Sequence, residues 1–293
     1  MKTIQPTTAQ LRMLADIRGN QWMIREDHAR GFALEALEAA ERIPMSDKDD
    51  GDKWLAQWYD LRRPMWIDSD QVAHVEIRGA LLPKCPSIYE RIGIATRYKT
   101  IMEESKSAIS SGAKAILFHI DSPGGAVSGN REAAEFIAEL PVPTASHCVG
   151  MACSAAYKLA AGTGEIHASP SAQVGNIGTI LSWADCTEFW KENGIEFKAL
   201  TNAGADLKST FHLEPNETQI EFLQSQIDEM GEQFRDHVIA GRAKAGAKLD
   251  PEVFRAGWYF GETALRLGLI DGIGTAEDAQ RSIAPNRSKV AFA

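Results

Sequence analysis

Short apolar runs alternate with amphipathic stretches along most of the chain. Residues 113–120 (AKAILFHI) and 144–149 are runs of strand length, and stretches with helical spacing follow at 127–139 and 153–161. The pattern also predicts strands over 72–82, 164–168, 173–181 and 195–200, and helices over 88–110, 184–193 and 216–243. The last of these helices begins after Asn216, a good N-cap residue, and residues 258–274 read as a strand, a short helix and a closing strand. This alternation predicts an α/β fold with a largely parallel, buried sheet flanked by helices.

The first 69 residues have a different pattern. Apolar residues recur at helical spacing from Trp22 to Ile43, Pro44 ends the pattern, and residues 46–52 (SDKDDGD) are polar and acidic. We therefore expect a small helical N-terminal segment with an acidic linker over 1–69, a main domain over 70–280, and a tail over 281–293.

Composition narrows the class of protein. The chain has 293 residues, a net charge of −9 and 44% hydrophobic residues, which fits a globular protein and argues against a general nucleic-acid binder. It contains no run of about 18 apolar residues and no apolar signal core at its start, so we expect no membrane span, no secretion and a cytoplasmic location. Its four cysteines show no CxxC pairing, and no phosphate-binding loop or ligand cluster appears, so we expect reduced thiols, no metal and no cofactor.

Two small-residue turns carry the candidate chemistry. The run 113–120 ends in DSPGG (121–125), where glycines leave backbone N–H groups open to a reacting oxygen. The run 144–149 leads into GMACSAAYKLA (150–160), which places Ser154 at the start of a helix. A serine beside a helix N-terminus is well placed to attack a carbonyl group held by the glycine turn.

With SPSAQVGNIG (169–178), AGADLK (203–208) and FGETALRLGLID (260–271), these motifs resemble the signal peptide peptidase A family of serine proteases. The likeness is to its soluble branch, the head-maturation (prohead) proteases of tailed phages and prophages, and it spans about residues 70–280. It implies a Clp protease/crotonase-like fold and a homo-oligomeric ring or dome. It also implies a cytoplasmic serine endopeptidase acting on polypeptides such as phage scaffold, portal or capsid proteins, with possible incorporation into a procapsid.

The resemblance also implies roles for individual residues. Ser154 matches the family's nucleophile and Lys208 its general base, while Gly125, with help from Gly124, and the amide of Ala155 match the oxyanion-hole donors. Asn176 stands where family members often have a serine that orients the lysine. An asparagine side chain can accept a hydrogen bond from an ammonium or donate one to an amine.

A lysine acts as a base near pH 7 only if its pKa falls from about 10.4 to roughly 7–8, which a desolvated pocket can achieve.

A Ser–His–Asp triad is the rival arrangement. His119 and His147 lie inside predicted strands, so we interpret them as structural histidines with hydrogen-bond partners. His212 follows Lys208 by four residues and stays a minor candidate for a catalytic base. Cys153 reads as a small core residue, because one residue along a helix turns the side chain by about 100°.

Two further functions stay open at this point. A crotonase-like acyl-CoA enzyme would use the same oxyanion turn without Ser154 or Lys208, and a non-catalytic protein could keep the fold as a ring-forming scaffold. The sequence also leaves open whether Ser154 and Lys208 meet within one subunit or between two.

Overall fold

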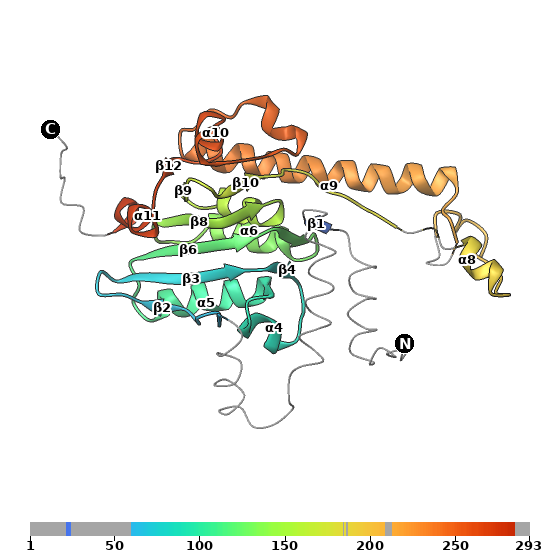
Figure 1. The fold of residues 1–293 in the computed structure, drawn as a ribbon, viewed down its shortest axis with the longest axis horizontal. Helices are drawn as coiled ribbons and strands as arrows, with labels where there is room; N and C mark the ends of the chain where they lie inside the picture. Colours follow the sequence, from blue (N-terminus) through green and yellow to red (C-terminus); the bar gives the residue numbers. More distant parts are fainter. Residues whose placement is uncertain (1–21, 25–59, 184, 186, 209–212, 285–293) are drawn as a thin grey trace, which may run out of the picture.

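A twisted, mostly parallel sheet forms the centre of the protein (Figure 1). The computed structural model describes residues 22–24, 60–183, 185, 187–208 and 213–284. The sheet order is β11-β10-β8-β6-β3-β2, and β9 extends it beside β8 and β12. The strands are β2 (Trp66–Ile67), β3 (Val72–Arg78), β6 (Ala115–Ser122), β8 (Thr144–Cys153), β9 (Glu165–Ala168), β10 (Gln173–Gly175), β11 (Trp258–Tyr259) and β12 (Gly272–Ile273). The pairs β3–β6, β6–β8, β8–β9 and β8–β10 are parallel, which confirms the predicted α/β class.

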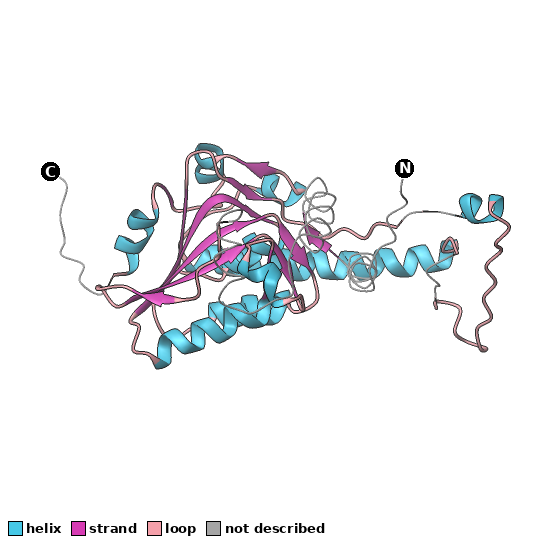
Figure 2. Cartoon of the chain, turned by 60° about the horizontal axis from the view of Figure 1, so that its bottom comes forward, coloured by secondary structure: helices cyan, strands magenta, loops and turns pink. Residues whose placement is uncertain are grey.

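Alternate residues of the central strands pack into two separate cores, which is why these strands read as continuous apolar runs. Ile116, Phe118 and Ile120 of β6 join the larger core, beneath α5 (Tyr98–Ser110), α6 (Asn130–Ala138) and α7 (Ala155–Ala161). Ala115 and Leu117 face the opposite way, toward α11 (Ala276–Ile283). Figure 2 shows the longer helices lying along one face of the twisted sheet.

A second, smaller sheet stands at the end of the first, with the order β1-β7-β4-β5. Its strands are β1 (Trp22–Ile24), β4 (Ala80–Leu82), β5 (Ala95–Arg97) and β7 (Gly124–Ala126). The single strand predicted over 72–82 is divided into β3 and β4 at Gly79, whose φ is 65°. The single helix predicted over 88–110 was wrong, because α4 (Ser87–Arg91) ends at a turn with Gly93 at φ 72° and β5 precedes α5.

The long helix α9 (Glu217–Lys244) begins where the sequence predicts, with Asn216 forming a capping box with Gln219. Figure 1 shows its first half projecting beyond the sheet, with α8 (Thr187–Glu192) beyond its N-terminal end. We call residues 178–208 together with this first half of α9 the arm. The predicted strand over 195–200 was wrong, since that stretch forms no strand, and the strand predicted over 173–181 is confined to β10. These segments leave the sheet for the arm, so they have no neighbouring strand to pair with.

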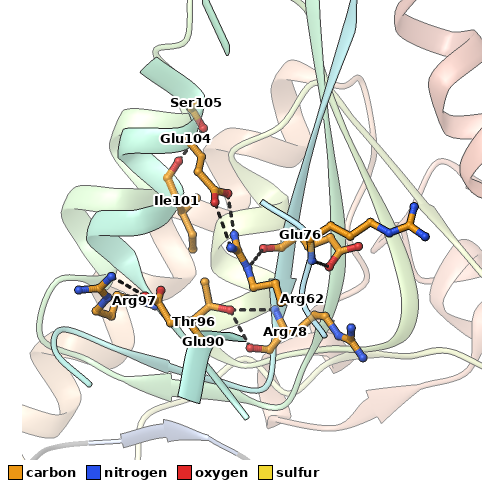
Figure 3. A network of polar contacts seen from close by, with 10 residues as sticks. Arg62, Glu76, Arg78, Glu90, Thr96, Arg97, Ile101, Glu104 and Ser105 are labelled. Carbon is orange, nitrogen blue, oxygen red and sulfur yellow. Dashed lines mark hydrogen bonds and ion pairs between the residues drawn. The ribbon is translucent and has the colours of Figure 1, made fainter. Parts of the chain in front are cut away.

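A buried ion pair fastens the segment before β2 to the main sheet. The Arg62 guanidinium donates two hydrogen bonds to the Glu104 carboxylate of α5, at 3.0 and 2.6 Å, and a third to the carbonyl oxygen of Glu76 on β3 (Figure 3). Both side chains are largely shielded from solvent, with exposed fractions of 6% and 16%. Removing one partner of such a pair leaves a buried charge, so the contact anchors residues 60–63 to the core.

Of the helix predicted from Trp22 to Ile43, the structure describes only the first three residues. Trp22–Ile24 form strand β1, so the predicted helix from Trp22 to Ile43 was wrong at its beginning, because these residues pair with β7. The rest of that helix and the acidic linker lie outside the described residues. Among the helices that the structure describes, none combines the length and the apolar character needed to span a bilayer.

Candidate active site

The two small-residue turns come together at the carboxyl ends of β6 and β8. The strands are parallel neighbours, and the register places Ser122 opposite Ala152 after a bulge. The Asp121 carboxylate accepts a hydrogen bond from the Met151 amide at 3.0 Å, so it joins the two turns. Gly150 fits closely beside it: a Cβ there would lie 2.6 Å from the Asp121 carboxylate oxygen, so a side chain at 150 would displace the carboxylate.

Ser154 occupies the sharp turn between β8 and α7. Its backbone has φ 55° and ψ −123°, a conformation that L-residues rarely adopt, and its amide donates a 2.7 Å hydrogen bond to the Gly175 carbonyl. The residue is 1% exposed, yet its side chain does not cap α7. A strained, buried serine at a helix N-terminus is characteristic of a nucleophile held by its surroundings.

The predicted oxyanion donors surround this serine. Gly124 and Gly125 are buried in β7, which lies against α7, and Ala155 is the first residue of α7. The Gly124 amide donates to the Ser122 hydroxyl at 3.2 Å, so it is already engaged. The amides of Gly125 and Ala155 are therefore the better candidates for binding a developing oxyanion. Glycine is needed at 125, since a Cβ there would lie 1.9 Å from the Leu81 carbonyl oxygen.

Asn176 lies directly after the carbonyl that receives the Ser154 amide. It has φ 57°, its amide donates to the Gly257 carbonyl at 2.7 Å, and its side-chain nitrogen donates to the Ala256 carbonyl at 2.8 Å. The Asn176 side chain therefore holds the loop before β11 against the serine turn.

The structure does not bring Lys208 to Ser154 within one chain. Lys208 is exposed, and its carbonyl accepts a 3.2 Å hydrogen bond from Gln219 in the first turn of α9. Helix α9 meets α7 much later, where Phe234 contacts Lys158. The 15 residues from Gln219 to Phe234 span about 22 Å of helix, which is well beyond the reach of one lysine side chain.

Lys158 is a buried lysine that the sequence did not distinguish. It lies one turn after Ser154, is 3% exposed, and its ammonium stands 5.6 Å from the centre of the Phe234 ring. Burial, and then the charge of Arg131, lower the pKa of Lys158 to about 8. The sequence pattern does not distinguish it, since a single lysine within an apolar helix does not reveal its burial.

The histidines within strands lie away from the serine. His119 shares a 2.9 Å hydrogen bond with His74, and burial lowers its pKa to about 4, so it is a neutral core residue at pH 7. His147 of β8 donates a 3.1 Å hydrogen bond from Nε2 to the Gly274 carbonyl, and it precedes Ser154 by seven residues. Seven residues of strand span about 23 Å. The interpretation of both as structural histidines is consistent with these positions, and His212 lies outside the described residues.

Two further polar residues shape the site. The Asn130 side chain, at the start of α6, is fully buried and donates to the Ala155 carbonyl at 3.1 Å. The Ser122 hydroxyl donates to the Gly79 carbonyl at 2.7 Å while accepting from Gly124. Ser122 lies within DSPGG and was therefore visible in the sequence, whereas Asn130 had no local signal.

Cys153 is fully buried as expected. No grouping of three or more potential metal ligands occurs within the part of the chain that the structure describes.

Comparison with known proteins agrees with this geometry. Residues 139–290 match peptidase family S49, and residues 102–174 match the Clp protease family. The second match contains both turns, and with the parallel sheet it confirms the predicted Clp-type fold.

Named proteases are among the relatives. A putative protease of Synechocystis is 29% identical over 72% of this chain and 72% of its own length. The putative signal peptide peptidase SppA of Enterococcus faecium is 28% identical over 67% of this chain, and the capsid assembly protease C of Escherichia phage lambda is 27% identical over 86% of it. This chain spans 56% of the length of each of these two relatives. With a family match over more than half of its residues, the chain belongs to peptidase family S49, the signal peptide peptidase A family.

Proposed function

We propose that the protein is a serine endopeptidase in which Ser154 is the nucleophile and Lys208 the general base. The observation that carries the proposal is the strained Ser154 at the N-terminus of α7, beside the glycines of β7. Membership of a peptidase family gives this arrangement its reaction class.

The reaction needs three tasks from these residues. Neutral Lys208 takes the hydroxyl proton as the Ser154 oxygen attacks the peptide carbonyl carbon. The amides of Gly125 and Ala155 donate to the resulting oxyanion, and each such donor contributes about 3 kcal/mol in the transition state. The lysine then gives its proton to the leaving amine, and water hydrolyses the acyl-enzyme by the same route.

Lys208 comes from a second copy of the chain in this proposal. The arm holds Lys208 too far from Ser154 of its own subunit. The arm also projects beyond the sheet, where it could reach a second copy of the chain (Figure 1). A neighbouring subunit would also provide the low-dielectric surroundings that an exposed lysine lacks and that a general base requires.

The substrate class that we propose is folded or assembling capsid protein. The relative from phage lambda is named a capsid assembly protease, and a relative from phage P21, 25% identical over 68% of this chain, is named a head-tail preconnector protein. Scaffold, portal or capsid polypeptides of a phage or prophage are accordingly the substrates to try first, with the protease enclosed in the procapsid.

Covalent labelling tests the dyad. An activated serine-directed phosphonate is expected to modify Ser154, at a rate that rises with pH as the base lysine loses its proton. Ser154→Ala should abolish labelling, and Lys208→Met should reduce it by at least about 100-fold, in the range of general-base contributions. Lys198→Met, which removes an exposed arm lysine paired with Glu196, is the matched control and should change little.

Other results of the labelling experiment would contradict the proposed dyad or the proposed peptidase activity. Labelling that depends on Lys158 instead of Lys208 would transfer the role of base to the buried lysine. Absence of labelling at every pH from 6 to 10 would contradict the peptidase proposal and favour a non-catalytic scaffold. Consumption of an acyl-CoA that survives Ser154→Ala would favour the crotonase-like alternative.

Mixed oligomers test the shared site. Ser154→Ala and Lys208→Met chains are each expected to be inactive, and coexpression of the two should restore activity, because some sites then combine an intact serine with an intact lysine. Mixtures that stay inactive while forming heteromers would show that the dyad forms within one chain.

A further inference from the structure

Strand β7 presents a peptide-binding edge at the proposed active site. It is bonded to β4 on one side, where Leu81 is opposite Gly125, and its other side is the edge on which the sheet adds one further strand. This second side carries backbone groups of Gly124–Ala126, in a strand that lies against α7, the helix that follows Ser154. An unpaired strand edge binds an extended peptide through main-chain hydrogen bonds.

In the structure that edge is occupied by the protein's own chain. Strand β1 pairs with β7 in antiparallel register, with Trp22 opposite Ala126, Met23 opposite Gly125 and Ile24 opposite Gly124. The pairing joins segments about 100 positions apart in the sequence, and Figure 1 shows β1 beside the carboxyl ends of β6 and β8. Met23 therefore lies directly opposite the glycine whose amide is a candidate oxyanion donor.

We propose that residues 22–24 occupy the strand position of a peptide substrate and act as a tethered competitor at the active site. The inference rests on the proposed peptidase function and adds a mode of regulation to it. Substrate must displace β1 from β7 before its backbone can pair with Gly124–Ala126. Any event that withdraws the N-terminal segment, such as its binding to another protein or its cleavage, would then increase activity.

The tether makes this competition effective even if the strand binds weakly. Two segments joined within one chain typically meet at an effective concentration on the order of millimolar. An isolated peptide of the same sequence with a dissociation constant of about 0.1 mM would then leave the edge free in roughly a tenth of molecules. Release of β1 should accordingly increase kcat/KM for an external peptide by about tenfold.

Proline substitutions test the strand pairing in the full-length protein. Proline lacks the backbone N–H group, and residues of an antiparallel strand alternate in the direction of their hydrogen bonds. Met23→Pro and Ile24→Pro therefore form a matched pair, of which one removes a hydrogen bond to β7 and the other does not. Met23→Ala and Ile24→Ala keep the backbone groups and serve as controls, and circular dichroism and thermal unfolding verify that each variant is folded.

Two readouts separate this inference from the proposed function. The first is binding of a fluorescein-labelled peptide of residues 18–30 to full-length chains that also carry Ser154→Ala, which needs no catalysis. We expect one proline variant to bind it about tenfold more tightly than the parent and the alanine controls. The second readout is hydrolysis of an unrelated peptide by the chains with Ser154 intact, where kcat/KM should rise in the same variant and the added peptide should inhibit competitively.

Equal peptide binding by the parent and both proline variants would overturn the inference. Release of the peptide-binding edge without any change in hydrolysis by an active enzyme would also overturn it, because the edge would then not be the substrate position. If no chain hydrolyses any peptide or labels at Ser154, the proposed function fails, and the binding readout still decides whether β1 blocks the edge.

Discussion

At the scale of single residues, the site is built from backbone conformations that local preference opposes. Ser154 and Asn176 both have positive φ, at 55° and 57°, and the Ser154 amide is bonded to the carbonyl of Gly175, whose φ is 115°. Such conformations cost on the order of 1–3 kcal/mol each and persist where the surrounding structure determines them. Here the parallel pairing of β8 with β10 and the bonds from Asn176 to the loop at Ala256 supply that constraint.

Lys158 gives a prediction about stability and pH. Its folded pKa of about 8 lies below the ordinary value of 10.5, so between these two values the unfolded chain binds more protons and the free energy of unfolding increases with pH. The full effect is about 3 kcal/mol. Lys158→Met removes the buried charge, so the variant should be more stable than the parent at pH 7. Its free energy of unfolding should then lack the increase between pH 7 and pH 10 that Lys158 gives the parent.

Urea unfolding of both proteins at pH 7, 8.5 and 10 measures the difference. Lys198→Met, at a site whose side chain is 77% exposed, should follow the parent at every pH. A Lys158→Met variant whose stability stays parallel to that of the parent would show that the ammonium is solvated in the folded protein.

At the scale of elements, the crossing of α7 and α9 determines how the helix that follows Ser154 is supported. Gly241 of α9 lies so close to α7 that a Cβ would be 1.8 Å from the Ala161 carbonyl oxygen. Arg242 follows it, fully buried, and forms a two-pronged ion pair with Asp271 at 2.8 and 2.7 Å. The second half of α9 is thereby attached to the core, whereas its first half extends into the arm.

Two glycines of α9 offer a matched pair of substitutions. Gly231→Ala should stabilise the protein by about 0.5–1 kcal/mol, because the new methyl group meets no atom within 4 Å and alanine favours the helix. Gly241→Ala should destabilise it by about 1–3 kcal/mol, since α7 and α9 must separate to admit the methyl group. Thermal unfolding measures both, and a stabilising Gly241→Ala would contradict the close approach of the two helices.

At the scale of the whole molecule, the arm exposes apolar side chains that a monomer would leave in water. Large hydrophobic residues that are at least 39% exposed along it are Ile180, Trp183, Phe189, Ile195, Leu200, Leu207, Ile220 and Phe222. An exposed apolar surface of this extent is typical of a protein–protein interface. The same arm carries Lys208, so one interface would bury the apolar surface and supply the proposed base.

Light scattering tests this interface. The parent is expected to have a mass several times the 32.1 kDa of one chain. Leu200→Asp, at a fully exposed apolar position, should weaken association by at least about 30-fold, because it removes about 2 kcal/mol of apolar burial. Leu265→Asp, on α10 (Gly261–Arg266) in the body of the protein, should leave the mass unchanged. A monomeric parent would contradict both the interface and the shared dyad.

Features that depend on local pattern could be predicted from the amino-acid sequence. Apolar runs of strand length became β6 and β8, Asn216 became the cap of α9, and the two small-residue turns lie at the carboxyl ends of those neighbouring strands. These signals are local because side-chain period, capping and turn chemistry involve residues within one or two turns of each other. The sequence therefore predicted the fold class and most of the candidate site.

Strand pairing and burial could not be predicted in this way, because they depend on residues far apart in the chain. Residues 22–24 have a helical pattern but form a strand, since an edge near residue 125 is open to them. Residues 195–200 have a strand pattern but lie in the arm, where no strand is adjacent. Lys158 and Lys208 are both lysines in the sequence, and the fold buries one and exposes the other. Their roles follow from solvation and distance, which no local pattern encodes.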